Sequence, residues 1–508
     1  MKQLSSLSGT LILILAVLFC IWSFARFLFE KKGQKRWSSI PGLLIILLIQ
    51  VTGYLTLYER FQELPMLYFG GAAMLMILFA FFSYRFVYRN LSEGLLCGML
   101  FSLAIGLLFI TRLNSSYAVR QLAYALLALL VCLLVPMFIR RMKMLRNAWI
   151  LYAVAGILAL ASVMLFGVTI NGATNWIKVF GFTLQPSEFV KISFIMMVAS
   201  MLYTFSVGKK PFVLISVFAA IHVLILVYQR DLGGALLLFL TFVGMTYYVS
   251  GSRKWLLLCL GGGGAAAVAG YFLFSHVQTR VMAWLDPWTY IDDRGYQIAQ
   301  SLFGIGSGSW FGSGLAEGMP GQIPVVISDF IFSGIVEELG ILFGICLIVN
   351  NLIMFLYLMR LAWDTKNAFH QYISIGCGMM ISMQSFLSIG GVIKLIPSTG
   401  VTLPLISYGG SSLISTIMML MIIEGLYIAD AEIDTGHDTK TEQPSVRKLS
   451  HKPLKYIVLT VIMFMTLIGY LVYFNVVTAP KILDNPYNKR VEISEDARLV
   501  HDVWLLIF

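Results

Sequence analysis

The chain has 508 residues, of which 59% are hydrophobic and only 12% charged, and its mean hydropathy is +0.85. Soluble domains carry roughly 25% charged residues, so this composition excludes an ordinary soluble protein and predicts an all-α polytopic membrane protein. The net charge of +11 does not indicate a nucleic-acid partner, because the basic residues stand in short loops between apolar runs.

Apolar runs of about 17 to 25 residues, the length that crosses a bilayer, recur along the whole chain. The first is expected to remain as a membrane helix, because it lacks the basic start and the cleavage site of a signal peptide. A short polar break at 229–231 separates two of the runs. The fourteen predicted spans are 9–29, 40–58, 64–84, 94–110, 122–138, 149–168, 187–205, 211–228, 232–249, 255–274, 329–358, 372–393, 403–427 and 456–473.

Clusters of lysine and arginine at 31–36, 140–143, 209–210 and 253–254 fall on one side of the membrane if these spans alternate. Basic loops face the cytoplasm. The N-terminus, the tail after Tyr473 and the loops 167–186, 229–231, 275–328 and 394–402 are then outside. Because these outside segments are rich in Trp, Asn, Gln, Gly and acidic residues, we expect the functional site there.

Asp329 opens one apolar run, and Glu337 and Glu338 lie two helical turns further into it. Charged residues inside a bilayer are costly and usually face a polar cavity, where they act on an ion or a substrate. Alternatively, Ser328 and Asp329 cap the start of the helix. Polar residues in the other outside segments favour the functional interpretation.

Those segments supply charged and hydroxyl side chains that an apolar bundle does not need. Glu188 and Lys191 share one face of a predicted helix, and a lysine one turn inside a membrane helix needs a partner. The glycine-serine run at 304–309 is not a nucleotide-binding loop, because it lacks the Gly-Lys-Ser/Thr ending. The candidate substrate-binding residues are Glu188, Lys191, Arg230, Asp231, Arg280, Gln297, Ser407 and Ser411.

Seven segments in order resemble the SEDS family of peptidoglycan polymerases, the RodA, FtsW and SpoVE group. They are 171–178, 185–191, 231–233, 295–301, 328–332, 337–340 and 403–412. The resemblance implies a ten-helix core that polymerises lipid II on the outer face of the bacterial cytoplasmic membrane, for cell shape, division or sporulation. It also implies a class B penicillin-binding protein as partner. In the family pattern the acid of the Asp-Phe-Ile-Phe motif is essential, which is Asp329 here.

The chain also departs from the family pattern. Asn175 stands where an arginine is common, and Arg230 replaces a proline. Val325, Val326 and Ile327 stand where many members carry an acid, a basic residue and a histidine. Without that histidine, Asp329 is the main candidate base.

Sugar transfer from a polyprenyl-pyrophosphate donor needs a base for the acceptor hydroxyl and positive charge for the departing pyrophosphate. Asp329 is predicted to be the base, with burial raising its pKa and the helix N-terminus lowering it. Lys191, Arg230 and Arg280 are candidates to bind the pyrophosphate. A divalent cation, Mg or Mn, is a possible cofactor, with Asp329, Asp231 and Glu338 as candidate ligands.

Two other functions fit many membrane spans with internal charges: a flippase for the same lipid, and an inactive scaffold for a penicillin-binding protein. The polar motifs gather on one face, and the two halves show no internal repeat, both of which disfavour a transporter.

The sequence divides into four regions. Residues 1–92 form three extra helices, and 93–430 form the core with the large loop 275–328. Residues 431–455 are predicted to be a cytoplasmic linker. Residues 456–508 resemble the membrane anchor and first external residues of a class B penicillin-binding protein, which implies packing against the spans 329–358 and 372–393.

Overall fold

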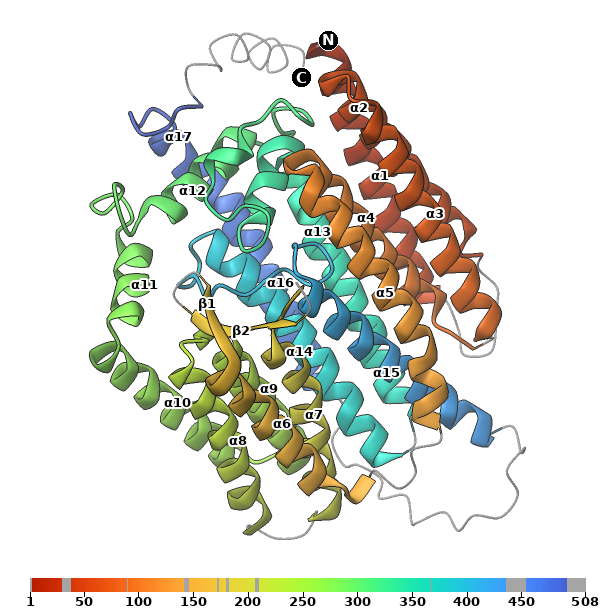
Figure 1. Ribbon diagram of the computed structural model, residues 1–508, viewed down its shortest axis with the longest axis vertical. Helices are drawn as coiled ribbons and strands as arrows, with labels where there is room; N and C mark the ends of the chain where they lie inside the picture. Colours follow the sequence, from red (N-terminus) through yellow and green to blue (C-terminus); the bar gives the residue numbers. More distant parts are fainter. Residues whose placement is uncertain are drawn as a thin grey trace.

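The computed structural model describes residues 2–29, 38–88, 90–140, 146–170, 173–179, 182–205, 210–365, 367–434 and 454–490. Within these residues, 13 helices are long and apolar enough to cross a membrane, and a shorter apolar helix covers Phe212–Tyr228. Each of the fourteen predicted spans therefore corresponds to a helix, and the all-α membrane fold is confirmed. The helices form an elongated bundle with roughly parallel axes (Figure 1).

The described residues form seventeen α-helices. They are α1 (Lys2–Phe29), α2 (Ile40–Phe61), α3 (Leu64–Val87), α4 (Glu93–Leu113), α5 (Ser115–Arg140), α6 (Trp149–Phe166), α7 (Pro186–Thr204), α8 (Lys210–Tyr228), α9 (Leu232–Ser250), α10 (Arg253–Leu273), α11 (Ser275–Leu285), α12 (Tyr296–Gly308), α13 (Ile331–Asp364), α14 (Ala368–Val392), α15 (Gly410–Asp434), α16 (Leu454–Tyr473) and α17 (Ala479–Ile482).

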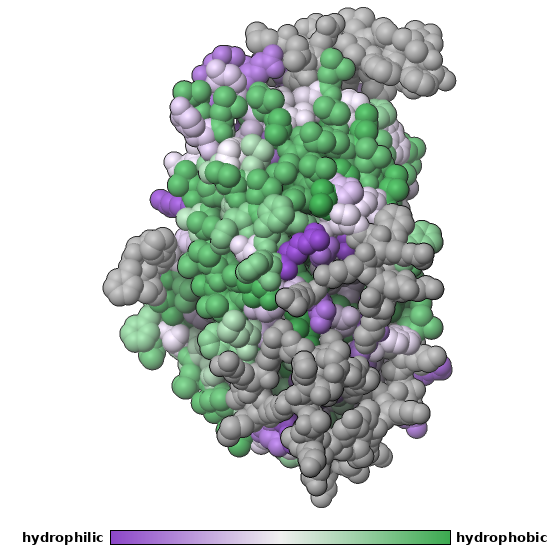
Figure 2. All heavy atoms as spheres, turned by 90° about the vertical axis from the view of Figure 1, so that its right-hand side faces the viewer, coloured by the Kyte–Doolittle hydropathy of each residue, from purple (hydrophilic) through white to green (hydrophobic). Residues whose placement is uncertain are grey.

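The three N-terminal helices pack on one side of the bundle, where α1 contacts α13 and both α2 and α3 contact α4. Ionic contacts fix their ends: Arg26 lies 3.3 Å and Arg85 3.5 Å from the Glu93 carboxylate at the start of α4. The upper part of this side, outside the atoms drawn in grey, is largely apolar (Figure 2). Its exposed apolar side chains, which suit contact with lipid tails, include Leu44, Leu48, Leu55, Leu75, Phe79 and Phe82.

Between α6 and α7 the chain forms a small antiparallel sheet, β1 (Gly167–Ile170), β2 (Ala173–Val179) and β3 (Phe182–Leu184), with β2 in the centre. The sequence predicted only a loop over 167–186. The segment is rich in β-branched residues, which favour strands, but hydropathy over a membrane-length window does not detect strands this short.

Several predicted helix boundaries are wrong; α5, for example, begins at Ser115 and not at 122. α13 runs to Asp364, beyond the predicted end at 358, and α15 begins at Gly410 instead of 403. Residues 403–409 are a turn, with Leu405 at φ +66°. The turn packs closely on α4, since a Cβ at Gly106 would lie 2.5 Å from the Ile406 carbonyl oxygen. Tertiary contact, not hydropathy, sets this boundary.

The predicted loop 275–328 also contains structure, namely α11, α12 and a 3-10 turn at Pro320–Gln322. α13 itself is broken at Gly340, where φ is +86°, a conformation that suits glycine. We call residues 331–339, between Asp329 and this break, the proximal half-helix. Backbone groups of the loop complete its end, because Ser313 N donates to Glu337 O and Gly314 N donates to Glu338 O, both at 3.0 Å.

The final span packs where the family resemblance implied, since α16 contacts α13 and α14. This prediction is confirmed. Of the predicted linker 431–455, residues 435–453 lie outside the described residues, as do residues 491–508 of the predicted tail.

If consecutive spans alternate in direction across the membrane, the start of α1 and the end of α13 lie at opposite faces, and the contacts of these two ends agree with that. The start of α1 approaches the large loop, with a Cβ at Gly9 lying 3.8 Å from Gly314 Cα. At the other end, Arg360 at the end of α13 donates to Phe27 O of α1 at 2.9 Å.

The basic clusters 31–36 and 141–143 lie outside the described residues. Which end of the bundle faces the cytoplasm therefore stays a prediction.

Candidate active site

Asp329 lies in a tight turn that precedes α13. Val325 adopts φ +55°, and its carbonyl oxygen accepts from Ser328 N at 3.2 Å and from Phe330 N at 3.4 Å. The N-cap residue of α13 is Phe330, and no side chain caps the helix. The capping interpretation of Ser328 and Asp329 is therefore wrong, and the Asp329 carboxylate is left for another role.

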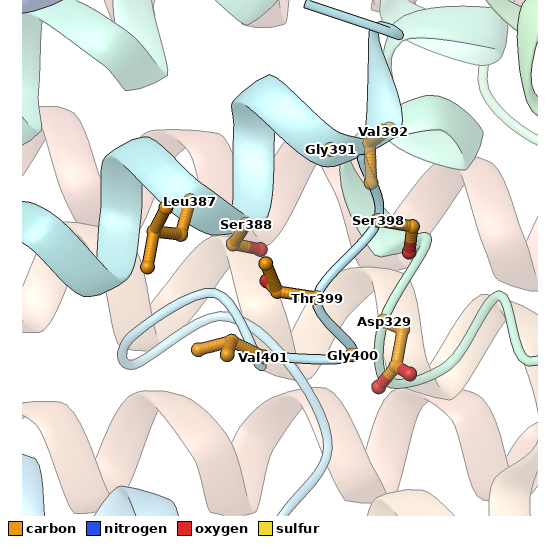
Figure 3. Close-up of a pocket in the computed structure, with 9 residues that line it drawn as sticks. All are labelled: Asp329, Leu387, Ser388, Gly391, Val392, Ser398, Thr399, Gly400 and Val401. Carbon is orange, nitrogen blue, oxygen red and sulfur yellow. The ribbon is translucent and has the colours of Figure 1, made fainter. Parts of the chain in front are cut away.

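Asp329 lines a small open depression, together with residues from the end of α14 and from the loop that follows it (Figure 3). The cavity volume is about 10 Å³, room for about one water molecule and far below the roughly 300–1,000 Å³ of pockets that hold drug-sized ligands. A large substrate head group must therefore extend beyond it. The other lining residues are Leu387, Ser388, Gly391, Val392, Ser398, Thr399, Gly400 and Val401.

Arg280 on α11 approaches the loop that carries Gly400. Its Nη1 donates to Ser398 O at 3.1 Å. A Cβ at Gly400, where φ is +70°, would lie 3.4 Å from Arg280 Nη2 and 3.6 Å from Asp329 Oδ2. Glycine at this position thus lets the guanidinium and the carboxylate approach the same point of the loop.

The charges of this site act on one another. Burial raises the pKa of Asp329, against the hydrogen bond from Ser328 and the positive charge of Arg280, which lower it. Burial lowers the pKa of Arg280, while Asp329 and Asp231 raise it. A carboxylate with a raised pKa beside a fixed cation is the arrangement that suits a general base next to an anion site.

Asp231 begins α9 and does cap it, because Gly234 N donates to its Oδ1 at 2.8 Å. Its Oδ2 accepts from Ser187 Oγ at 3.2 Å and from Asn175 Nδ2 and Gln185 Nε2 at 3.4 Å. The predicted site residue Asp231 therefore joins the sheet, α7 and α9. The departure at Asn175 keeps a hydrogen bond to this aspartate.

Glu188 and Lys191 form the predicted pair inside α7, at 2.7 Å, and both are buried. Lys191 Nζ also donates to Gln384 Oε1 at 3.0 Å, and Ser415 Oγ donates to Glu188 Oε2 at 2.9 Å. Gln384 in turn donates to Thr402 O at 3.1 Å. Through Gln384 the pair is thus linked to Thr402, in the loop that follows the pocket-lining residues. Contact of Lys191 with a substrate stays a prediction.

The two predicted serines hold segments together. Ser407 Oγ donates to Ser328 O at 2.6 Å and accepts from Leu403 N at 2.9 Å, directly beside Asp329. Ser411 Oγ accepts from Gln185 N at 3.0 Å. Both hydroxyls position backbone around the site, a role that the sequence did not assign to them.

Of the predicted site residues, only Asp329 lines the pocket. Gln297 is exposed on α12, and Arg230 is exposed with φ +63°. Glu338 is buried at the far end of the proximal half-helix, 2.9 Å from Arg112. The metal set of Asp329, Asp231 and Glu338 is not assembled, and the described part of the chain contains no group of three potential metal ligands.

His276 on α11 was not among the site residues predicted from the sequence. Burial lowers its pKa, and the charges of Arg230 and Arg280 lower it further, so the three side chains share one positive environment. Its Nε2 has no hydrogen-bond partner among the described residues. The only available signal was an imidazole in an outside segment. Gln384 was also missed, although an amide inside a membrane span requires partners.

Comparisons with known proteins agree with this architecture. A family model described as "Cell cycle protein", covering FtsW, RodA and SpoVE, matches residues 95–430. The peptidoglycan glycosyltransferase RodA of Mycobacterium tuberculosis is 34% identical over 322 residues, which cover 60% of this chain and 69% of that protein. The probable peptidoglycan glycosyltransferase FtsW of Aliivibrio salmonicida is 32% identical over 327 residues, covering 60% and 78%.

Two solved structures share the fold. A chain from a peptidoglycan synthase complex, whose structure concerns the coordination of polymerization and crosslinking, has a TM-score of 0.57 and 25% identity, covering 69% of this chain and 100% of that chain. The rod shape determining protein RodA of Thermus thermophilus has a TM-score of 0.52 and 25% identity, covering 66% and 96%.

Proposed function

Because the chain belongs to the FtsW, RodA and SpoVE family, we propose that it is the peptidoglycan glycosyltransferase that joins lipid II units into glycan strands, with Asp329 as its catalytic base. The chain is a multi-pass membrane protein. The observation that carries the proposal is Asp329: it caps no helix, lines an open depression and shares the loop at Gly400 with Arg280.

In the proposed reaction the Asp329 carboxylate accepts the proton of the acceptor sugar's hydroxyl as its oxygen attacks the anomeric carbon of the donor. The bond between that carbon and the pyrophosphate oxygen breaks, and the polyprenyl pyrophosphate leaves with the electron pair. Burial supports this role, because it raises the pKa of Asp329 and so strengthens the base.

The leaving pyrophosphate needs fixed positive charge. Arg280 supplies it beside Asp329, and Arg230 adds a second positive charge, since both arginines lower the pKa of the nearby His276. A Mg²⁺ or Mn²⁺ would be held by Asp329 together with substrate oxygens, because the oxygens of Asp231 already accept four hydrogen bonds. When bound, that cation neutralises developing charge on the pyrophosphate.

The site is proposed to face the outside of the cytoplasmic membrane. The lipid tail then stays in the bilayer while the head group reacts at its surface. We further propose a class B penicillin-binding protein as partner, with residues 456–508 as the equivalent of its anchor. The packing of α16 on α13 and α14 supports this reading of the C-terminal region.

The test is a polymerisation assay on the purified protein with lipid II and a divalent cation, with and without a class B penicillin-binding protein. Glycan strands are the expected product, and Asp329→Ala should abolish them while the protein keeps its elution profile. If Asp329→Ala polymerises as well as the parent protein, the assignment fails. Transport of labelled lipid II across liposomes without polymer would instead indicate a flippase.

A further inference from the structure

The proximal half-helix carries Asp329 before its first turn and two buried glutamates in its last. Each glutamate is held by an arginine from a different part of the chain. Glu338 binds Arg112 of α4 at 2.9 Å and accepts from Ala316 N at 3.0 Å. Glu337 binds Arg490, which lies 17 residues beyond the end of α16.

Arg490 binds Glu337 through two nitrogens. Its Nε lies 2.9 Å from Glu337 Oε1, and its Nη2 lies 3.1 Å from Oε2. Glu337 Oε1 also accepts from Met319 N at 2.7 Å. Two-pronged arginine–carboxylate contacts are stronger and more directional than single ones. Both side chains are buried, so removing one partner would leave the other charge uncompensated.

The same guanidinium reaches two further segments. Nη1 donates to Gln300 Oε1 of α12 at 2.9 Å, and Nη2 donates to Met319 O at 3.3 Å. One side chain therefore ties the chain's C-terminal part to α12, to the large loop and to the proximal half-helix.

We call residues 474–490 the C-terminal tail. It follows α12 closely, as Figure 1 shows for α17. A Cβ at Gly306 would lie 3.3 Å from Ala479 Cβ. Nearer its end, Tyr487 O accepts from Gln300 Nε2 at 3.3 Å, and Tyr487 Oη donates to Asp292 at 3.1 Å. These contacts hold the C-terminal tail against α12 and so place Arg490 beside Glu337.

We propose that Arg490 is a positioning residue: through Glu337, the C-terminal tail fixes the proximal half-helix and so the place of Asp329. The half-helix has no continuous helix behind it, because the chain breaks at Gly340. Arg112 and Arg490 hold its end from two sides instead. The consequence for catalysis rests on the proposed function of Asp329, whereas the consequence for local order does not.

The test uses the purified full chain with Arg490→Gln, and with Lys489→Gln as matched control, because Lys489 is the exposed neighbour. Hydrogen exchange is measured over residues 331–339 and, for reference, over 410–430. Arg490→Gln should speed exchange in 331–339 about tenfold and leave 410–430 unchanged. In the polymerisation assay kcat should fall about ten- to a hundredfold with an unchanged KM for lipid II, since only the geometry of Asp329 is altered.

A double variant separates positioning from simple loss of folding. Glu337→Gln with Arg490→Gln leaves no unpaired charge, so its exchange in 331–339 should lie closer to the parent than that of Arg490→Gln alone. If Arg490→Gln exchanges like Lys489→Gln, or if both reference and half-helix exchange faster to the same extent, the proposal is overturned. If the parent makes no polymer while 331–339 still loosens, the proposed function fails and the positioning role stands.

Discussion

Asp231 and Asp329 occupy similar places, each just before a long helix, and both act on Arg280. Asp231 caps its helix through Gly234 N and binds three side chains. Asp329 stands one residue too early to cap, because the turn at Val325 makes Phe330 the first boundary residue. One carboxylate is therefore committed to structure, and the other remains available for chemistry.

An aspartate just before a helix can therefore be either a structural cap or a candidate catalytic residue. Aspartate before a helix usually indicates a cap, and that reading is right for Asp231. For Asp329 the backbone turn prevents capping and directs the carboxylate into the pocket lined by Gly400 (Figure 3). A carboxylate with an incomplete set of donors in a concave site is the better candidate for catalysis.

Replacing Asp329 by Asn gives the largest expected effect. The variant keeps the shape of the side chain but cannot accept a proton, so polymerisation should slow by about a hundredfold to ten-thousandfold. Asp293→Asn is the matched control, since Asp293 is an exposed aspartate paired only with its neighbour Arg294 among the described contacts. Initial rates with lipid II measure the effect, and equal rates for both variants would make Asp329 no different from a surface acid.

Arg280→Gln should give the next largest effect, a loss of about a hundredfold in kcat, the size expected for one donor to a developing anion. It should also change the pH profile. Arg280 lowers the pKa of Asp329, so its removal raises that pKa further and moves the acidic limb of kcat/KM to higher pH. An unshifted or downward-shifted limb would remove Arg280 from the surroundings of the base.

The positions of the membrane spans followed from the sequence, because the bilayer dictates the length of an apolar helix. The small sheet and the start of α15 did not follow. Both depend on contacts between segments, such as Tyr408 N with Ile327 O at 3.0 Å. Hydropathy has no information on such contacts.

For the site, Asp329 was predicted from its place at the start of an apolar run, and Glu188 and Lys191 from their spacing on one helix face; the last two do form a buried pair. The sequence did not reveal that Gln384 receives the lysine or that Arg490 binds Glu337. These partners are far apart in the sequence, so no local spacing encodes them. Which polar residues touch substrate and which hold the loops is decided by the three-dimensional contacts.

Asp231→Ala should lower the stability of the protein. Loss of an N-cap costs about 1 kcal/mol of stability, and the lost bonds to Ser187, Asn175 and Gln185 add to that cost. Thermal unfolding in detergent should therefore occur at lower temperature than in the parent. Asp231→Asn is the matched control, because asparagine also caps helices well; equal losses in both variants would show that the charge, and not the cap, is what stabilises α9.

Asp329→Asn should have the opposite effect on stability, and a smaller one. Burial raises the pKa of Asp329 in the folded protein, so the folded state binds the proton more tightly than the unfolded chain. The stability from that group is complete below the unfolded pKa of about 3.9 and is lost as the pH rises through the folded pKa. Above the folded pKa the parent therefore carries a buried charge at a cost that Asn does not have, and there the variant should unfold at an equal or higher temperature. Scans across pH 4 to 8 should show the parent approaching the variant as the pH falls. A variant less stable than the parent above the folded pKa would mean that Asp329, like Asp231, is a structural residue.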